Sequence, residues 1–134
     1  MDDQTFDPAR IGAELGFTTE ELMMNRGGAL SDRQRALLQS RQHTALGGIL
    51  GRFASLKVHE IVGIARTRTR RAPIAPDPRY AGGVRYEVSI GKMTFLVRNQ
   101  AVLDVFDDGA RYRAYYAGGG GRYYSVLLSA ERVG

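Results

Sequence analysis

The stretch VRYEVSIGKMTFLV, residues 84–97, holds two runs in which apolar residues recur at every second position. This period of two predicts two β-strands, each with one buried face. The residues between the runs are Gly91 and Lys92, and a two-residue connection with glycine first suits a type II′ turn. The stretch therefore predicts a β-hairpin, and the organisation of the chain can be worked outward from it.

The same period recurs in three further segments, and a short helical pattern capped by Asn99 lies between the hairpin and the last two strands. An order of three strands, a helix and two strands is that of the oligonucleotide/oligosaccharide-binding (OB) fold, a small closed or nearly closed barrel. We therefore expect a five-stranded, OB-like β-barrel over residues 57–134, with a Src-homology-type barrel as the alternative. The added elements are strands over 58–70, 111–117 and 124–130 and a helix over 100–106.

Residues 1–56 have helical patterns instead, so the expected fold class is α+β, with N-terminal helices packed on the barrel. Asp7-Pro8 can start a first helix, and Thr18 or Thr19 can cap a second. Ser31 and Gln34 fit a capping box that opens the longest helix. That helix offers an apolar surface for pairing with a second copy of the chain, formed by Leu37, Leu38, Ala45 and Ile49.

Several function classes are disfavoured by composition. The 134 residues include no cysteine and only two histidines, His43 and His59, so a metal cage or a cysteine nucleophile is not expected. No apolar run approaches the roughly 18–20 residues of a membrane-spanning helix. No nucleophile, base and orienting group stand at a useful spacing, so we expect neither catalysis nor a cofactor. An enzyme for a phosphorylated or acidic small molecule is the least favoured alternative.

Charge is divided unevenly between the two halves. Residues 57–134 carry thirteen Lys/Arg and seven Asp/Glu, a net charge of +6, whereas residues 1–56 carry six and seven, a net charge of −1. A basic half of this kind favours an anionic partner, such as a nucleic acid or a phospholipid surface.

The sharpest basic feature is the run RTRTRR, residues 66–71. On a strand, Arg66, Arg68 and Arg70 project from one face, about 7 Å apart, and Arg71 follows them. Such a row can follow phosphates or lipid headgroups. The alternative is an edge strand that charge protects from pairing with other chains.

Tyrosines interleave with arginines in the last two strands. Tyr112, Tyr116 and Tyr124 share the inward parity, which leaves Tyr115 and Tyr123 as exposed rings. Aromatic rings beside arginines can stack on bases, so a single-stranded nucleic-acid-binding barrel that uses these two rings with the arginine row is the alternative function.

Residues 25–34, NRGGALSDRQ, resemble the N-R-x-G-x-L-S-x-x-Q opening of an uncharacterised family of bacterial membrane proteins. Residues 112–116, YRAYY, and 127–131, LLSAE, are similar to the end of the soluble β-rich segment of that family. The hydrophobic hairpin between the two parts is missing here. The family has no established activity. The resemblance therefore implies a non-enzymatic structural or interaction module, without a transmembrane segment, in the cytoplasm at the inner face of the membrane. Its expected partner is an anionic membrane surface or a protein.

Overall fold

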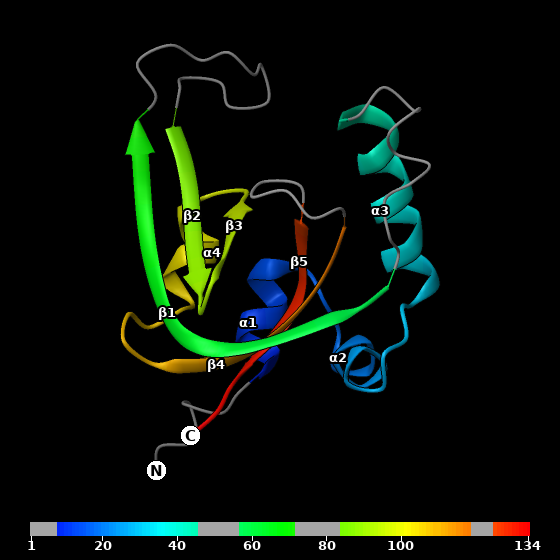
Figure 1. Ribbon diagram of the computed structural model, residues 1–134, viewed down its shortest axis with the longest axis horizontal. Coiled ribbons are helices and arrows are strands. Elements are labelled where there is room, and N and C mark those ends of the chain that lie inside the picture. The colour runs from blue at the N-terminus through cyan, green and yellow to red at the C-terminus, as the bar shows by residue number, and fades with distance from the viewer. Residues whose placement is uncertain (1–7, 46–56, 72–83, 119–124) are drawn as a thin grey trace.

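The structure is a computed structural model that describes residues 8–45, 57–71, 84–118 and 125–134. It confirms the α+β class, because N-terminal helices pack against a five-stranded antiparallel sheet (Figure 1). In the described residues the elements are α1 (Pro8–Leu15), α2 (Thr19–Arg26), α3 (Asp32–Ala45), β1 (His59–Arg71), β2 (Val84–Ile90), β3 (Met93–Val97), α4 (Gln100–Asp104), β4 (Arg111–Gly118) and β5 (Ser125–Arg132).

The sheet has the order β3-β2-β1-β4-β5 and is not closed, so the expectation of a closed barrel is wrong. β3 and β5 form the two edges and approach each other without pairing. Helices α1 and α2 pack against β5, and Ile11 and Leu22 from these helices share one core with Leu127 of β5. The helices thus bury apolar side chains of β5 that closure of the sheet would otherwise have to bury.

β1 holds the sheet together because it bends and changes partner along its length (Figure 1). Its first half pairs with β4 up to Ile64, and its second half pairs with β2 from Ala65 onward. The turn between β2 and β3 packs against the strand at Gly63, where an added Cβ would lie 2.4 Å from the amide nitrogen of Gly91. Only glycine leaves room for that approach.

The local expectations for turns and caps are confirmed. Gly91 has a φ of +60°, and no described residue other than glycine has a positive φ, as a type II′ turn requires. Thr18 caps α2, and Asn99 caps α4. Ser31 and Gln34 form the expected capping box, with Gln34 N donating to Ser31 Oγ at 3.0 Å. Helix α4 ends at Asp104, two residues earlier than expected.

The two halves of the chain share their hydrophobic cores. Ile11, Phe17 and Leu22 lie in the same buried cluster as residues of all five strands or the side chains packed against them. A second cluster joins Leu30 and Leu38 to β4 and β5. Leu38 is therefore used inside the chain and is not available to a second copy, whereas Leu37 is exposed. The Ala45 side chain and Ile49 lie outside the described residues, and self-association stays a prediction.

We predict that Leu22→Ala lowers the free energy of unfolding by about 2–5 kcal/mol, because it leaves a cavity in the core shared by α2 and the sheet. Its neighbour Met23 is 59% exposed while Leu22 is 1% exposed, so Met23→Ala is the matched control. The control should change stability by no more than about 0.5 kcal/mol. Urea denaturation measures both values. Equal, small losses would mean that α2 does not share a core with the sheet.

We also predict that Gly63→Ala destabilises the protein by about 1–3 kcal/mol, because its methyl group collides with backbone that cannot move freely. Gly27→Ala is the control, since Gly27 has a negative φ of −86° and an added Cβ there meets its nearest atom at 3.6 Å. Thermal denaturation of the two variants compares them directly. A Gly63→Ala variant as stable as the Gly27→Ala variant contradicts the close approach at the bend.

Candidate functional site

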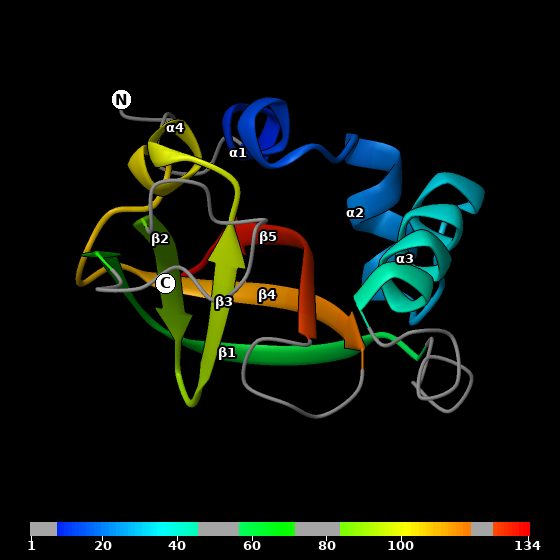
Figure 2. The same ribbon diagram turned by 90° about the horizontal axis from the view of Figure 1, so that it is seen from above.

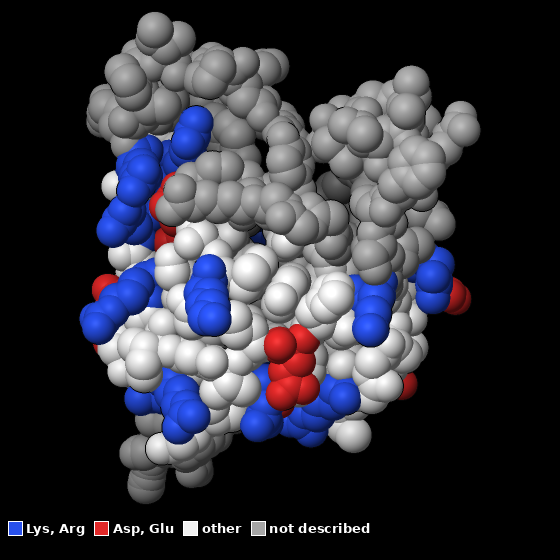
Figure 3. Space-filling view, in the orientation of Figure 1, with Lys and Arg blue, Asp and Glu red and all other residues white. Residues whose placement is uncertain are grey.

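The arginine row lies on the second half of β1, where the strand pairs with β2. Side chains alternate between the two faces of a strand. Ala65 faces the core and is fully buried, so its neighbours Arg66, Arg68 and Arg70 project from the opposite, outer face. All three are exposed. Figure 3 shows basic side chains gathered along the left of the molecule, over β1 and β2.

The register with β2 adds a fourth arginine to this face. Arg70 stands opposite Arg85, Arg68 opposite Glu87, and Arg66 opposite Ser89. Among the described residues, this face therefore holds four guanidiniums, from residues 66, 68, 70 and 85, and the carboxylate of Glu87, so their formal charges leave a net of three positive charges. We call these four arginines the arginine face.

Glu87 is buried in the middle of the arginine face, with Arg70 Nε 3.6 Å from its Oε1. A buried carboxylate needs compensating charge, and this ion pair supplies part of it. Arg66 and Arg68 differ from Arg70, because they form no hydrogen bond or ion pair with any residue in the described ranges. Their charges are therefore directed to solvent.

The alternative explanation of the arginines, protection of a strand edge, stays a prediction, because this half of β1 pairs with β2 alone although β1 is the middle strand of the sheet. Past the residues of β1 that pair with β4, the loop between α4 and β4 covers the edge of β1 that faces away from β2. Ala65 N donates to Ala110 O at 2.9 Å, and Thr67 N donates to Asp108 Oδ1 at 2.5 Å. Asp108 thus serves as a cap for the strand backbone, in addition to its place in a turn.

Tyr115 is buried, so its expected role as an exposed stacking ring is wrong. The position of Tyr115 along β4 predicts the face of the sheet on which its side chain lies, but not which residues cover that face. Its hydroxyl donates to Glu131 Oε2 at 3.4 Å, and Arg26 of α2 lies close by. Burial raises the pKa of Tyr115, and the negative charges of Glu131 and Glu60 raise it further. Tyr123 and the side chain of Arg71 lie outside the described residues.

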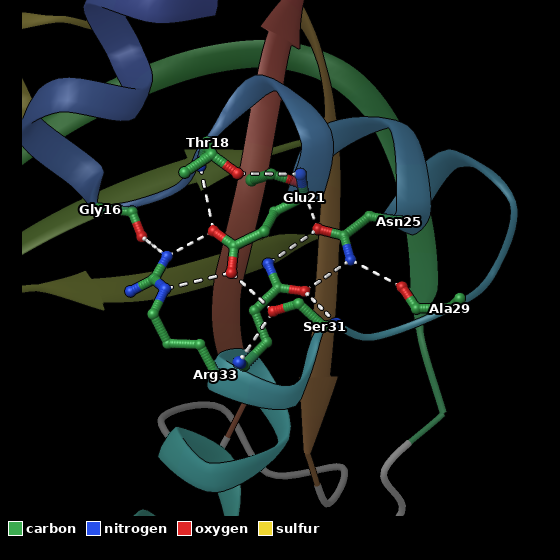
Figure 4. Close-up of polar contacts among 9 residues, drawn as sticks. Gly16, Thr18, Glu21, Asn25, Ala29, Ser31 and Arg33 are labelled. Atoms are coloured by element: carbon green, nitrogen blue, oxygen red, sulfur yellow. Dashed lines mark hydrogen bonds and ion pairs between the residues drawn. The ribbon is translucent and has the colours of Figure 1, made fainter.

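A buried polar cluster that was not predicted from the sequence links the helices to β5 (Figure 4). The amides of Asn25 and Gln34 pair with each other, at 2.9 Å from Asn25 Nδ2 and 3.1 Å from Gln34 Nε2. Ser129 Oγ of β5 donates to Asn25 Oδ1 at 2.6 Å, and Asn25 Nδ2 also donates to Ala29 O at 2.9 Å. All of these residues belong to the two motifs that resemble the membrane-protein family, residues 25–34 and 127–131.

Arg26 makes a second link to β5 beside this cluster. Its guanidinium meets the Glu131 carboxylate with both arms, at 2.5 Å from Nη2 and 3.1 Å from Nε. Such a two-armed pair is directional as well as charged. The hydrogen bond with Glu131 is the main cause that raises the pKa of Arg26. Arg26 belongs to the motif at residues 25–34 and Glu131 to the motif at residues 127–131. The sequence therefore contained both residues of the pair, but their spacing alone does not show that the two motifs are in contact.

Glu21 organises the turn between the helices (Figure 4). Its carboxylate accepts hydrogen bonds from Arg33, from Ser31 Oγ at 2.5 Å and from Thr18 N at 3.0 Å. Burial by itself raises the pKa of Glu21, but these donors and the Arg33 charge outweigh it, so the net pKa is below the ordinary value. The carboxylate therefore stays ionised in the folded protein at neutral pH.

The chemistry available elsewhere in the described ranges is limited. They contain no group of three or more His, Asp or Glu placed to hold a metal ion. His59 stacks on Tyr116 with ring centroids 5.3 Å apart, whereas Glu60 pairs with Arg113 at 3.1 Å, so the two adjacent residues do not act together. The polar side chains that do converge are those that dock the helices.

Comparison of the chain with protein-family models, with curated proteins and with solved structures finds no match. Among the described helices, none has the length and apolar character needed to cross a membrane.

We predict that Glu21→Gln lowers the free energy of unfolding by about 1–2 kcal/mol near neutral pH, because a charged acceptor for Arg33 and Ser31 is lost. Since the folded-state pKa of Glu21 is lowered, its contribution is complete above the ordinary value of 4.5 and is lost as the pH falls through the folded value. The difference between wild type and variant should therefore shrink in acid. Denaturation as a function of pH measures this, with exposed Glu20→Gln as the control; a difference independent of pH contradicts the assignment.

Proposed function

We propose that the protein is a non-enzymatic interaction module that binds an anionic partner through the arginine face. The observation that carries this proposal is the pair Arg66 and Arg68, both exposed and both without a hydrogen bond or ion pair to any described residue. Arginines that serve a fold are held by carboxylates or carbonyls, as Arg26 and Arg33 are here. Arginines directed to solvent in a row about 7 Å apart suit a run of phosphate groups.

The local charge supports the same proposal. In formal charge, Glu87 offsets one of the four arginines, and its side chain is buried while Arg66, Arg68 and Arg70 are exposed. Thr67 and Asp108 bind one another at the side of the strand and not on its outer face. A surface with one sign of charge attracts polyanions and raises their association rate, in a manner that falls with salt.

For the fold, we propose an open, OB-like arrangement, with the Src-homology-type barrel as the alternative. Its support is the element order, with α4 between β3 and β4, and the approach of β3 to β5 across the opening. OB folds are themselves partly open, and they use the face of their middle strands for binding. Here that region includes β2, beside the arginine row.

The proposal of a non-enzymatic role rests on how the polar residues are used. Glu21, Asn25 and Gln34 are held in helix-docking contacts, and Glu131 is held by Arg26. We propose a relation to the membrane-protein family as well, and its support is that the contacts of Asn25 with Ser129 and of Arg26 with Glu131 join the two motifs that carry the resemblance. With that relation we propose a cytoplasmic location at the inner face of the membrane, where anionic lipid is present.

Single-stranded nucleic acid is less well supported as the partner. Binding modules of that kind stack bases on exposed rings. In the described ranges no tyrosine or phenylalanine is exposed, and Tyr115 is buried. The phosphates of a nucleic acid still share the chemistry of lipid headgroups, so the test includes both.

We predict that the double variant Arg66→Gln/Arg68→Gln weakens binding of the protein to polyanions and lowers the slope of log K against log salt by about 2, one unit for each lost phosphate contact. Arg70 is left unchanged because it pairs with buried Glu87. Binding to anionic vesicles and to a single-stranded oligonucleotide is measured side by side at low and physiological salt.

The matched control is Arg35→Gln, which removes an exposed arginine of α3. The control should bind as the wild type does. If wild type binds neither polyanion at low salt, or if the control loses as much affinity as the double variant, the arginine face is not a binding surface.

A further inference from the structure

We infer that the anionic partner is a lipid bilayer and that Ile64, at the outer corner of β1, inserts among its headgroups. This inference rests on the proposed function and identifies the partner of the same face. It starts from one feature that the arginines do not explain: a large aliphatic side chain, 44% exposed, in the middle strand of a sheet.

The bend of β1 places Ile64 on the convex side. Ile64 is the last residue that pairs with β4, and Ala65 is the first that pairs with β2, so the change of direction falls between them. Gly63 faces the inside of the bend, where Gly91 packs against it. Because side chains alternate, Ile64 faces outward at the same point.

No described helix covers this side of the strand. Seen from above, α1 and α4 lie on one side of the sheet and β1 forms the opposite side (Figure 2). Among the described residues, the other exposed large hydrophobic side chains are Met23, Met24 and Leu37, which belong to α2 and α3 at the other end of the molecule from the bend (Figure 1). In the part of the chain that the structure describes, Ile64 is thus the one large apolar side chain exposed at this corner.

Basic side chains flank Ile64 on two sides. Arg66 follows it on the same face of β1, and Arg111 of β4 is its direct cross-strand partner. Both arginines are exposed. The nearest acidic residue on the same face of β1 is Glu60, four positions away, and its charge is paired with Arg113 at 3.1 Å. The corner therefore combines one apolar side chain with a basic surround.

Solitary exposed isoleucines are common and have no meaning by themselves. The combination with a convex, basic surround is what favours a bilayer. A convex corner buries little area against another folded protein, whereas fluid headgroups close around it and take up its apolar tip. Membrane binding of surface groups increases with both buried apolar area and attraction to anionic lipid. An aliphatic side chain gives no comparable gain with a nucleic acid, which rewards flat rings.

The chain has no tryptophan, so a single one introduced at the corner reports its surroundings without interference. We predict that Ile64→Trp shows a blue shift of its emission with vesicles of equal phosphatidylglycerol and phosphatidylcholine, and quenching by lipid brominated on the acyl chain. Leu37→Trp is the control on an exposed position of α3, and it should show neither change. Vesicles of phosphatidylcholine alone should give no response, because they lack the anionic headgroups.

A second variant separates insertion from charge. Ile64→Thr keeps a β-branched residue on the strand and should weaken binding to the anionic vesicles about fivefold, by loss of apolar burial. It should leave binding to a single-stranded oligonucleotide unchanged. Quenching together with this selective loss supports the inference.

The opposite results overturn it in distinguishable ways. Vesicle binding with an unquenched reporter and no effect of Ile64→Thr removes the insertion but leaves the arginine face as an anion-binding surface. Binding to the oligonucleotide and not to vesicles removes the lipid partner and leaves the proposed function. Absence of binding to both removes the inference together with the proposed function.

Discussion

The contact between Gly63 and Gly91 is the constraint on which the arrangement of the sheet depends. With no side chain at Gly63, the turn between β2 and β3 reaches the backbone of β1 and the strand can bend around it. The bend lets one strand pair with β4 through its first half and with β2 through its second. A straight strand would pair both partners along one flat sheet and leave the core open. The same bend creates a concave side that holds the core and a convex side that faces solvent.

The buried amide pair of Asn25 and Gln34 fixes the helices to this sheet. Buried polar groups are unfavourable unless they are hydrogen-bonded, so a cluster in which each amide has a partner selects one way of docking. Ser129 supplies the contact from β5, and the pair of Arg26 with Glu131 repeats the link at the surface. Leu30 and Leu38 pack beside these contacts. Apolar burial therefore stabilises the docked state, and the polar cluster determines its register.

The features that could be predicted from the sequence are those that depend on near neighbours. Alternation and the Gly91 turn predicted the hairpin, and the capping box predicted the start of α3, because both signals lie within a few residues. The predictions of a closed barrel and of an exposed Tyr115 were both wrong, and for the same reason. Both depend on α1 and α2 packing against β5, and the pattern of a strand gives the face of a side chain but not what covers that face. The link of the polar cluster to β5 was missed because Asn25 and Ser129 are 104 positions apart.

The distribution of charge on the outer face of β1 is unusual for a surface that serves stability alone. Arg70 and Arg85 are direct cross-strand partners of like charge, which is unfavourable, and the Glu87 carboxylate lies 3.6 Å from Arg70. Arg66 and Arg68 add charge and form no hydrogen bond or ion pair with a described residue, so neutral residues of high strand propensity would suit the sheet better there. Charge that is kept at some expense of stability is expected where a surface is used for binding, since function commonly opposes the optimum of stability. The convex corner at Ile64 follows the same logic, because it leaves a large apolar side chain 44% exposed to water.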